Sequence, residues 1–302
     1  MKGSFQRTWR VAVTEWRTSL RNRRALVMTL LFVAVAALVM YGTISAFAAM
    51  ERELVAALKL PDAGATGSVT MTLWKSPIFS RIVEHMTGGS LVFADIRGRH
   101  PILLAYALFI FQIAPLLTLV VSASRVADDL RSGLARYWLV RVSRTEWSLG
   151  KFLGEAMMLG VSMLAGALAA WGVAVCRLPA ADGLSLLPGL LDWTARAWAY
   201  AFAWLGLFTG LSHVVKSGGK AMALSILAML AATIWPVILT FFVPNEGPLS
   251  VLGHLDALVP SAARSQMWRR SPAVLLQGVT HLTALAFLYL SLGAAVFQRR
   301  DV

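Results

Sequence analysis

Charged residues are scarce in this sequence. Asp, Glu, Lys and Arg make up 14% of its 302 residues, whereas 58% are hydrophobic and the mean hydropathy is +0.67. Soluble domains carry about 25% charged residues, so this composition excludes an ordinary soluble domain and predicts an integral membrane protein. Cysteine is almost absent as well, since Cys176 is the only one. A single thiol excludes an internal disulfide and a thiolate metal site, and no other residue pattern predicts a metal site.

Charges are also missing from the middle of long stretches of the chain. Six apolar runs span residues 25–50, 101–124, 149–175, 193–215, 221–243 and 272–296. About 20 apolar residues cross a bilayer as a helix, so each run is long enough. We therefore predict an all-α integral membrane protein in which residues 1–302 form a single transmembrane domain of six helices. The first run lacks a cleavage site of the usual kind and is expected to stay as a signal anchor.

The sequence lacks the residues on which several membrane activities depend. Ion-coupled carriers and channels place ionisable groups at membrane depth, and none of the six runs has an Asp, Glu, Lys or Arg near its middle. An intramembrane serine protease would need Ser162 with His281 as its base, but the motif around the serine is only four residues long. No Gly-x-x-x-x-Gly-Lys-Ser/Thr loop occurs for binding ATP. We expect no catalytic residue in this chain.

The distribution of Lys and Arg predicts the orientation in the membrane. Placing the amino terminus in the cytoplasm puts 17 of the 28 basic residues but only 6 of the 15 acidic ones on the inner side. Basic loops stay on the cytoplasmic side, so both termini are expected to be cytoplasmic. The pI of about 10.8 follows from this rule and from attraction to anionic lipid. Nucleic acid is not an expected partner, because no base-stacking module accompanies the basic residues.

Residues 5–20 are predicted to form an amphipathic helix at the membrane surface. Phe5, Trp9, Val13, Trp16 and Leu20 recur at spacings of three and four residues and share one face. Arg7, Arg10, Thr14, Arg17 and Arg21 lie on the other face. Trp on one face and Arg on the other is typical of a helix lying in the inner leaflet. Glu15 is interpreted as a member of a solvated ion pair or as a contact for a cytoplasmic partner.

Two outer segments are longer than a connection requires. Residues 51–100 form the longest loop, with a possible short helix at Trp74–Thr87, and this loop could bind an extracytoplasmic protein. The segment 244–271 contains an apolar stretch at 249–259 and is expected to form short outer helices.

The cytoplasmic segment 125–151 carries the most information. Asp128 and Asp129 before Leu130 indicate a helix start, and Gly133 interrupts it. Leu134, Tyr137, Trp138 and Val142 form an apolar strip that an exposed loop would not normally display. The segment is predicted to be a short helix that contacts a protein or, alternatively, lies on the lipid surface.

This arrangement resembles the permease subunits of type-2 ABC transporters, a family that includes the permease of the nitrous oxide reductase maturation system. The residues that carry the resemblance around this segment are Asp129, Arg131, Gly133, Ser143, Arg144, Gly150 and Lys151. Glu15 with the basic run 21–24 before the first span, and the ending 297–301, are similar to the family as well. The resemblance covers the whole chain in order.

The resemblance implies that the membrane-spanning permease and the ATPase are separate subunits. The short inner helix would be a coupling helix that binds a separate cytoplasmic ATPase, and two copies of this permease would work with two copies of the ATPase. ATP and Mg²⁺ would be bound by that partner, so this chain needs no cofactor. The implied ATPase-coupling residues are Asp128, Asp129, Arg131, Gly133, Arg136, Ser143 and Arg144, with Lys216 and Lys220 as a second contact. The implied function is export across a bacterial inner membrane, or force transmission to an extracytoplasmic partner without passage of a substrate.

Small and polar residues inside the runs predict how the helices pack. Gly150-x-x-x-Gly154, Ser162-x-x-x-Gly166-x-x-x-Ala170 and Gly206-x-x-x-Gly210 allow close approach, within one chain or at a dimer seam. Gln112, Gln277 and His281 are polar positions that could line a pathway or form hydrogen bonds between helices. Asp192 and Arg196 are expected to pair at the outer rim.

Overall fold

The computed structural model describes residues 2–58, 81, 84, 90–96, 99–178, 180–242 and 255–299. Within these ranges the chain is helical and contains no strand, which confirms the all-α class. Five helical stretches are long and apolar enough to cross a membrane, and they are Ala25–Met50, Pro101–Ser132, Arg144–Arg177, Gly218–Pro236 and Pro272–Gln298. They belong to α2 (Arg23–Leu58), α6 (Pro101–Ser122) with α7 (Arg125–Ser132), α9 (Arg144–Arg177), α12 (Gly218–Phe242) and α15 (Pro272–Gln298).

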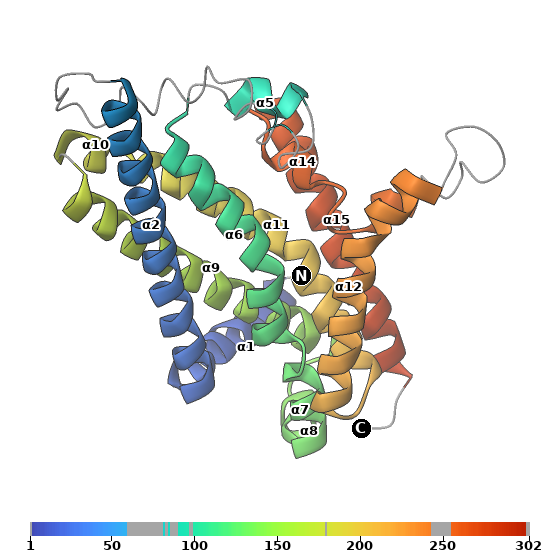
Figure 1. The fold of residues 1–302 in the computed structure, drawn as a ribbon. Coiled ribbons are helices and arrows are strands. Elements are labelled where there is room, and N and C mark those ends of the chain that lie inside the picture. The colour runs from blue at the N-terminus through green and yellow to red at the C-terminus, as the bar shows by residue number, and fades with distance from the viewer. Residues whose placement is uncertain are drawn as a thin grey trace.

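The predicted span 193–215 falls on α11 (Leu187–Val214), which is 28 residues long but is not among the five stretches that are apolar enough to cross a membrane. This helix occupies the middle of the bundle and packs against α15, α6, α9 and α12 (Figure 1). Its buried side chains include Trp193, Thr194, Arg196, Tyr200 and Trp204. Neighbouring helices rather than lipid surround most of these side chains, so the helix does not need a uniformly apolar surface. The count of six spans stays a prediction.

Several predicted boundaries are corrected by local hydrogen bonding. The span predicted at 149–175 belongs to a helix that begins at Arg144, because Ser143 and Glu146 form a capping box. The backbone N–H of Ser143 donates to Glu146 Oε2 at 2.9 Å, and the Glu146 N–H donates to Ser143 Oγ at 3.3 Å. Such a box satisfies the free N–H groups of a helix start. The predicted first span coincides with the apolar stretch Ala25–Met50, although the helix that carries it, α2, continues to Leu58.

The amino-terminal helix α1 (Lys2–Arg21) packs along α9 through a face that the sequence did not predict. Its buried residues are Thr8, Val11, Ala12, Glu15 and Ser19. In contrast, Phe5 is 71% exposed and Trp9 is 48% exposed, so the predicted apolar face is left free for lipid. Trp16 is half-buried and Arg17 is exposed. The helix therefore has a face for protein, a face for lipid and a basic face.

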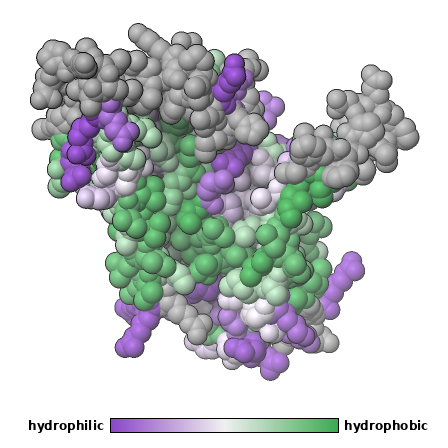
Figure 2. Space-filling view, viewed as in Figure 1, coloured by the Kyte–Doolittle hydropathy of each residue, from purple (hydrophilic) through white to green (hydrophobic). Residues whose placement is uncertain are grey.

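Short helices gather at the two ends of the bundle (Figure 1). One end carries α7 and α8 (Leu134–Leu139) together with α1, and we call it the α7–α8 end. The opposite end carries α5 (Ser90–Ile96), α10 (Ala180–Ser185) and α14 (Arg264–Met267), and η2 (Leu255–Leu258) also belongs to the predicted outer segment. Figure 2 shows a hydrophobic band between more hydrophilic ends, as expected for a membrane bundle. Most of the long loop 51–100, including most of Trp74–Thr87, lies outside the described residues.

The glycine spacings serve packing within the chain. A Cβ at Gly150 would lie 2.5 Å from Val11 Cβ, and one at Gly154 would lie 2.7 Å from Glu15 Cβ, so α1 approaches α9 at these glycines. Gly206 and Gly210 of α11 meet the backbone of α15 at Ala286 and Tyr289. Gly166 meets the ring of Phe32 on α2. The intra-chain alternative is therefore confirmed for these motifs.

Candidate functional site

The α7–α8 hairpin follows directly from the end of α6. Gly133 joins its two helices with φ of 77°, a left-handed conformation that glycine adopts without steric cost. The predicted break at Gly133 is thus confirmed. The predicted start at Asp128 and Asp129 is wrong by about one turn, because α7 begins at Arg125 after Ser124. The acidic pair therefore lies inside the helix.

One face of the hairpin is anchored in the protein. Val126 and Ala135 are fully buried in an apolar cluster with Val11, Trp147 and Phe297, which come from α1, α9 and α15. Trp138 and Val142, which were predicted to belong to an exposed strip, pack against this cluster instead. Arg144 strengthens the attachment, since its Nη1 donates to the carbonyls of Phe297 and Gln298 at 2.7 and 2.9 Å.

The other face of the hairpin is exposed and apolar. Leu134, Tyr137 and Val140 are 47%, 58% and 86% exposed, and the guanidinium of Arg141 lies 4.8 Å from the centre of the Tyr137 ring. Arg136, Leu139, Val140, Val142, Ser143 and Arg144 line a shallow depression beside this face. A contiguous apolar surface with a basic rim is typical of a protein contact site.

Behind the hairpin lies a buried cluster of charged side chains. Lys151 of α9 is 4% exposed, and its ammonium forms ion pairs with the carboxylates of Glu15 on α1 and Asp129 on α7. Arg125 Nη1 lies 3.6 Å from Glu15 Oε1, and Arg125 Nε donates to the Val121 carbonyl at 3.3 Å. We call Glu15, Arg125, Asp129 and Lys151 the ion cluster. It joins α1, α7 and α9 at one point.

This cluster corrects the interpretation of Glu15. The side chain is neither solvated nor available to a cytoplasmic partner, because Glu15 is 8% exposed and paired within the chain. A buried charge is costly unless opposite charges accompany it, so the two carboxylates and Lys151 depend on one another. Asp129, predicted to contact an ATPase, likewise points inward to Lys151.

A second polar group continues from the ion cluster into the bundle. Glu155, one turn after Lys151, is fully buried, and its Oε2 accepts a hydrogen bond from Thr209 of α11 at 3.1 Å. His213 contacts Ser148 Oγ at 2.8 Å and the Thr209 carbonyl at 2.7 Å. These residues tie α9 to α11. The sequence offers only the Lys151–Glu155 spacing as a signal, since both residues lie at the inner end of the predicted span 149–175.

The remaining predicted coupling residues lie around the outside of the hairpin. Arg131 is exposed and lies 3.6 Å from Asp128, whose carboxylate also sits against Gly218 at the start of α12. Arg136 is exposed on α8. Lys216 and Lys220 are exposed in and after the connection between α11 and α12, and α12 packs against α7. The structure thus brings these residues to one end of the molecule, with Asp129 turned inward.

The predicted pathway residues have separate local contacts. Gln112 is exposed on α6 and accepts a hydrogen bond from Arg264 at 3.3 Å. Gln277 is exposed on α15, and His281 Nε2 contacts the Ala257 carbonyl at 2.7 Å. Ser162 pairs with Thr29 Oγ1 at 2.8 Å rather than with His281, so the protease arrangement is absent from the described residues.

Ion pairs also bind the opposite end of the bundle together. The predicted pair of Asp192 and Arg196 is confirmed at 2.8 Å, and Arg99 lies 3.0 Å from the same carboxylate. Arg269 Nε donates to Asp95 at 2.6 Å, and this hydrogen bond lowers the pKa of Asp95 below its ordinary value. Arg196 Nη1 donates to the Arg269 carbonyl at 2.8 Å, so α11 holds the segment that follows α14.

The fold is that of a multi-pass helical membrane protein, and comparison with known families agrees. The family model described as "ABC-2 family transporter protein" matches residues 9–302. The chain therefore belongs to the ABC-2 family and is a transmembrane permease component of an ABC transporter. No curated protein matches the sequence. Among the described residues, no group of His, Cys, Asp and Glu is arranged to hold a metal ion.

Proposed function

We propose that this chain is the passive permease of an ATP-driven exporter and that a separate ATPase binds the α7–α8 hairpin. The observation that carries the proposal is the contrast between the two faces of the hairpin. Val140 is 86% exposed on one face, whereas the other face is anchored by the buried apolar cluster and the ion cluster. An exposed apolar face suits a protein partner, and a rigid attachment suits the transmission of its motion.

Motion of the hairpin would reach the spanning helices through particular contacts. The ion pair of Asp129 and Lys151 connects α7 to α9, and the ion pair of Lys151 and Glu15 connects α9 to α1. The Ala127 N–H donates to Ser212 Oγ at 3.0 Å and leads to α11. Asp128 against Gly218 leads to α12. Because packed interiors resist compression, displacing the hairpin displaces these helices together.

The proposal includes the assembly and its orientation. Two permeases of this kind work with two ATPases, which bind ATP and Mg²⁺, in a bacterial inner membrane. The α7–α8 end and both termini face the cytoplasm, which requires α11 to be the sixth span. The basic residues of the hairpin and of α1 support this orientation. Arg131, Arg136, Lys216 and Lys220 supply the charged rim of the ATPase contact.

A second form of the same proposal involves no transported substrate. The ATPase cycle would move the end of the bundle opposite the α7–α8 end, which carries α5, α10 and α14. This movement would act on an extracytoplasmic protein, as the resemblance to a maturation system implies. The ion pairs favour this form, because Arg99–Asp192 connects the segment after α5 to α11, and Arg269–Asp95 connects α5 to the segment after α14. Transport of a labelled amphiphile into vesicles distinguishes export from pure force transmission.

The test is to place a charge on the exposed face of the hairpin. Val140→Asp would desolvate a carboxylate in the proposed interface, and we expect affinity for the ATPase to fall at least about tenfold. Co-purification in mild detergent and stimulation of ATPase activity measure the effect. Leu184→Asp is the matched control, because Leu184 is 57% exposed on α10 at the opposite end. Equal ATPase binding by both variants would exclude the hairpin as the docking site.

A further inference from the structure

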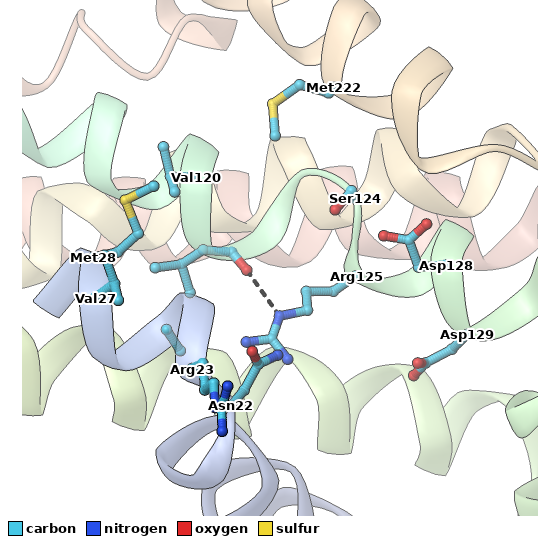
Figure 3. A pocket seen from close by; sticks show the side chains of 12 residues that line it. Asn22, Arg23, Val27, Met28, Val120, Ser124, Arg125, Asp128, Asp129 and Met222 are labelled. Carbon is cyan, nitrogen blue, oxygen red and sulfur yellow. Dashed lines mark hydrogen bonds between the residues drawn. The ribbon is translucent and has the colours of Figure 1, made fainter. Parts of the chain in front are cut away.

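A cavity of about 540 Å³ lies at the α7–α8 end, on the side of the bundle where α2, α6 and α12 meet the hairpin. Figure 3 shows its lining. Its walls come from the start of α2, the end of α6, the start of α7 and Met222 of α12. A volume of this size falls in the range of about 300–1,000 Å³ of small-molecule sites.

The lining divides into an apolar part and a charged part. Val27, Met28, Val120, Val121 and Met222 provide the apolar part. Asn22, Arg23, Ser124, Arg125, Asp128 and Asp129 provide the polar part. A ligand that fills both parts must therefore be amphiphilic.

The charged part favours an anion. Asp129 is already paired with Lys151, and Asp128 lies 3.6 Å from Arg131 and against the first residue of α12. Arg23 is exposed and, within the described residues, makes no ion pair. Among the residues that the structure describes, Arg125 has one ion-pair contact, at 3.6 Å to Glu15.

Helix ends add to this positive potential. The 36-residue helix α2 begins at Arg23, and α7 begins at Arg125, so both amino termini lie at the cavity. Free backbone N–H groups and the helix dipole attract an anion at such an end. At the start of α7, Ser124 makes no capping hydrogen bond, and Ser212 Oγ accepts from the Ala127 N–H alone.

The apolar part continues along α6 toward the middle of the bundle. Val120 and Leu116 are four residues apart on one face, and they are 42% and 43% exposed. The helices α2 and α12 both pack on α6 and have little contact with each other, and they diverge on either side of it (Figure 1). The exposed stripe of α6 between them is apolar, which suits contact with an acyl chain.

We propose that this cavity binds an anionic phospholipid from the leaflet at the α7–α8 end. Arg23 and Arg125 hold the phosphate, and the acyl chain lies along Val120 and Leu116. The site does not depend on ATPase binding, so it stands apart from the proposed transport function.

The test uses the purified full chain in nanodiscs with photoactivatable phosphatidylglycerol or phosphatidylcholine and mapping of the labelled peptides. We expect preferential labelling of α6 around Leu116 by the anionic lipid. Arg23→Gln should lower that labelling about fivefold, since a basic residue near a membrane surface contributes about that factor. Arg17→Gln is the matched control, because Arg17 is exposed on α1 and does not line the cavity. Val120→Trp, which fills the apolar part, should also abolish labelling.

Three results would overturn the proposal. Equal labelling by the anionic and zwitterionic lipids would show that the cavity does not select charge. Equal losses in Arg23→Gln and Arg17→Gln would assign the effect to general surface charge. Displacement of the label by excess inorganic phosphate, with Val120→Trp without effect, would identify a soluble-anion site instead. Because the ATPase is absent from this measurement, each result leaves the docking proposal untouched.

Discussion

At the scale of single residues, Lys151 is the side chain on which the α7–α8 end depends. It is 4% exposed and compensates the carboxylates of both Glu15 and Asp129. Removing one member of a buried ion group leaves charges without partners in a medium that solvates them poorly. Lys151 Nζ also lies 5.8 Å from the centre of the Trp147 ring, which provides an additional cation–π contact.

We therefore expect Lys151→Met to lower the free energy of unfolding by about 3 kcal/mol or more. Thermal denaturation in detergent measures the change. Lys220→Met is the matched control, because Lys220 is exposed and belongs to no ion pair among the described residues. Adding Asp129→Asn to Lys151→Met should recover part of the stability, since it removes one uncompensated carboxylate. Equal melting temperatures for Lys151→Met and Lys220→Met would contradict the role of the ion cluster.

At the scale of elements, the packing of α1 on α9 depends on two glycines, which have no side chain and so allow the two helices to approach closely. Gly150 and Gly154 of α9 lie one turn apart, and Val11, Ala12 and Glu15 of α1 fill the space above them. Close approach brings the Glu15 carboxylate to Lys151 and leaves Phe5 and Trp9 free for lipid. The helix is thus attached to the bundle as well as suited to the membrane surface.

Gly154→Leu is expected to detach α1. A Cβ there would lie 2.8 Å from the Ala12 carbonyl, and overpacking of this kind costs about 1–3 kcal/mol before the longer side chain is added. Hydrogen–deuterium exchange should show faster exchange in residues 2–21 with little change in α11 and α15. Gly172→Leu, on the same helix, is the control, because a Cβ at Gly172 meets nothing within 4 Å. Unchanged protection of α1 in Gly154→Leu would contradict this packing.

At the scale of the whole molecule, the two ends differ in chemistry and in proposed side of the membrane. The α7–α8 end holds the ion cluster and the exposed hairpin. The opposite end holds the ion pairs of Asp95 and Asp192 and the last residues of α9. Cys176, the only cysteine, is exposed there, one residue before the end of α9.

This cysteine gives a direct measurement of orientation. A membrane-impermeant maleimide added to intact cells should label Cys176 without permeabilisation. In the double variant Cys176→Ser, Ser132→Cys, the thiol lies on the exposed surface of α7, and labelling should require permeabilisation. The reverse pattern would place the α7–α8 end outside the cell and would remove the basis for a cytoplasmic ATPase contact.

Local signals predicted much of the fold. The apolar runs predicted the spanning helices, because about 20 apolar residues suit a bilayer wherever they occur in a chain. Gly133 and the spacing of Gly206 and Gly210 predicted a helix break and a close helix pair, and both are present. The pair of Asp192 and Arg196 followed from a spacing of four residues on one helix.

Contacts between residues far apart in sequence were not predicted in this way, because these contacts exist only after distant helices have packed. Glu15 and Lys151 are separated by 136 positions, and neither the surface helix predicted around Glu15 nor the span predicted around Lys151 indicates the other residue as a partner. Only the docking of α1 onto α9 brings them together and removes water from both. The same holds for the cavity at Arg23 and Arg125, which exists because α2 and α12 diverge around α6. Helix formation depends on neighbours along the chain, whereas the burial of charge and the shape of a cavity depend on which helices meet.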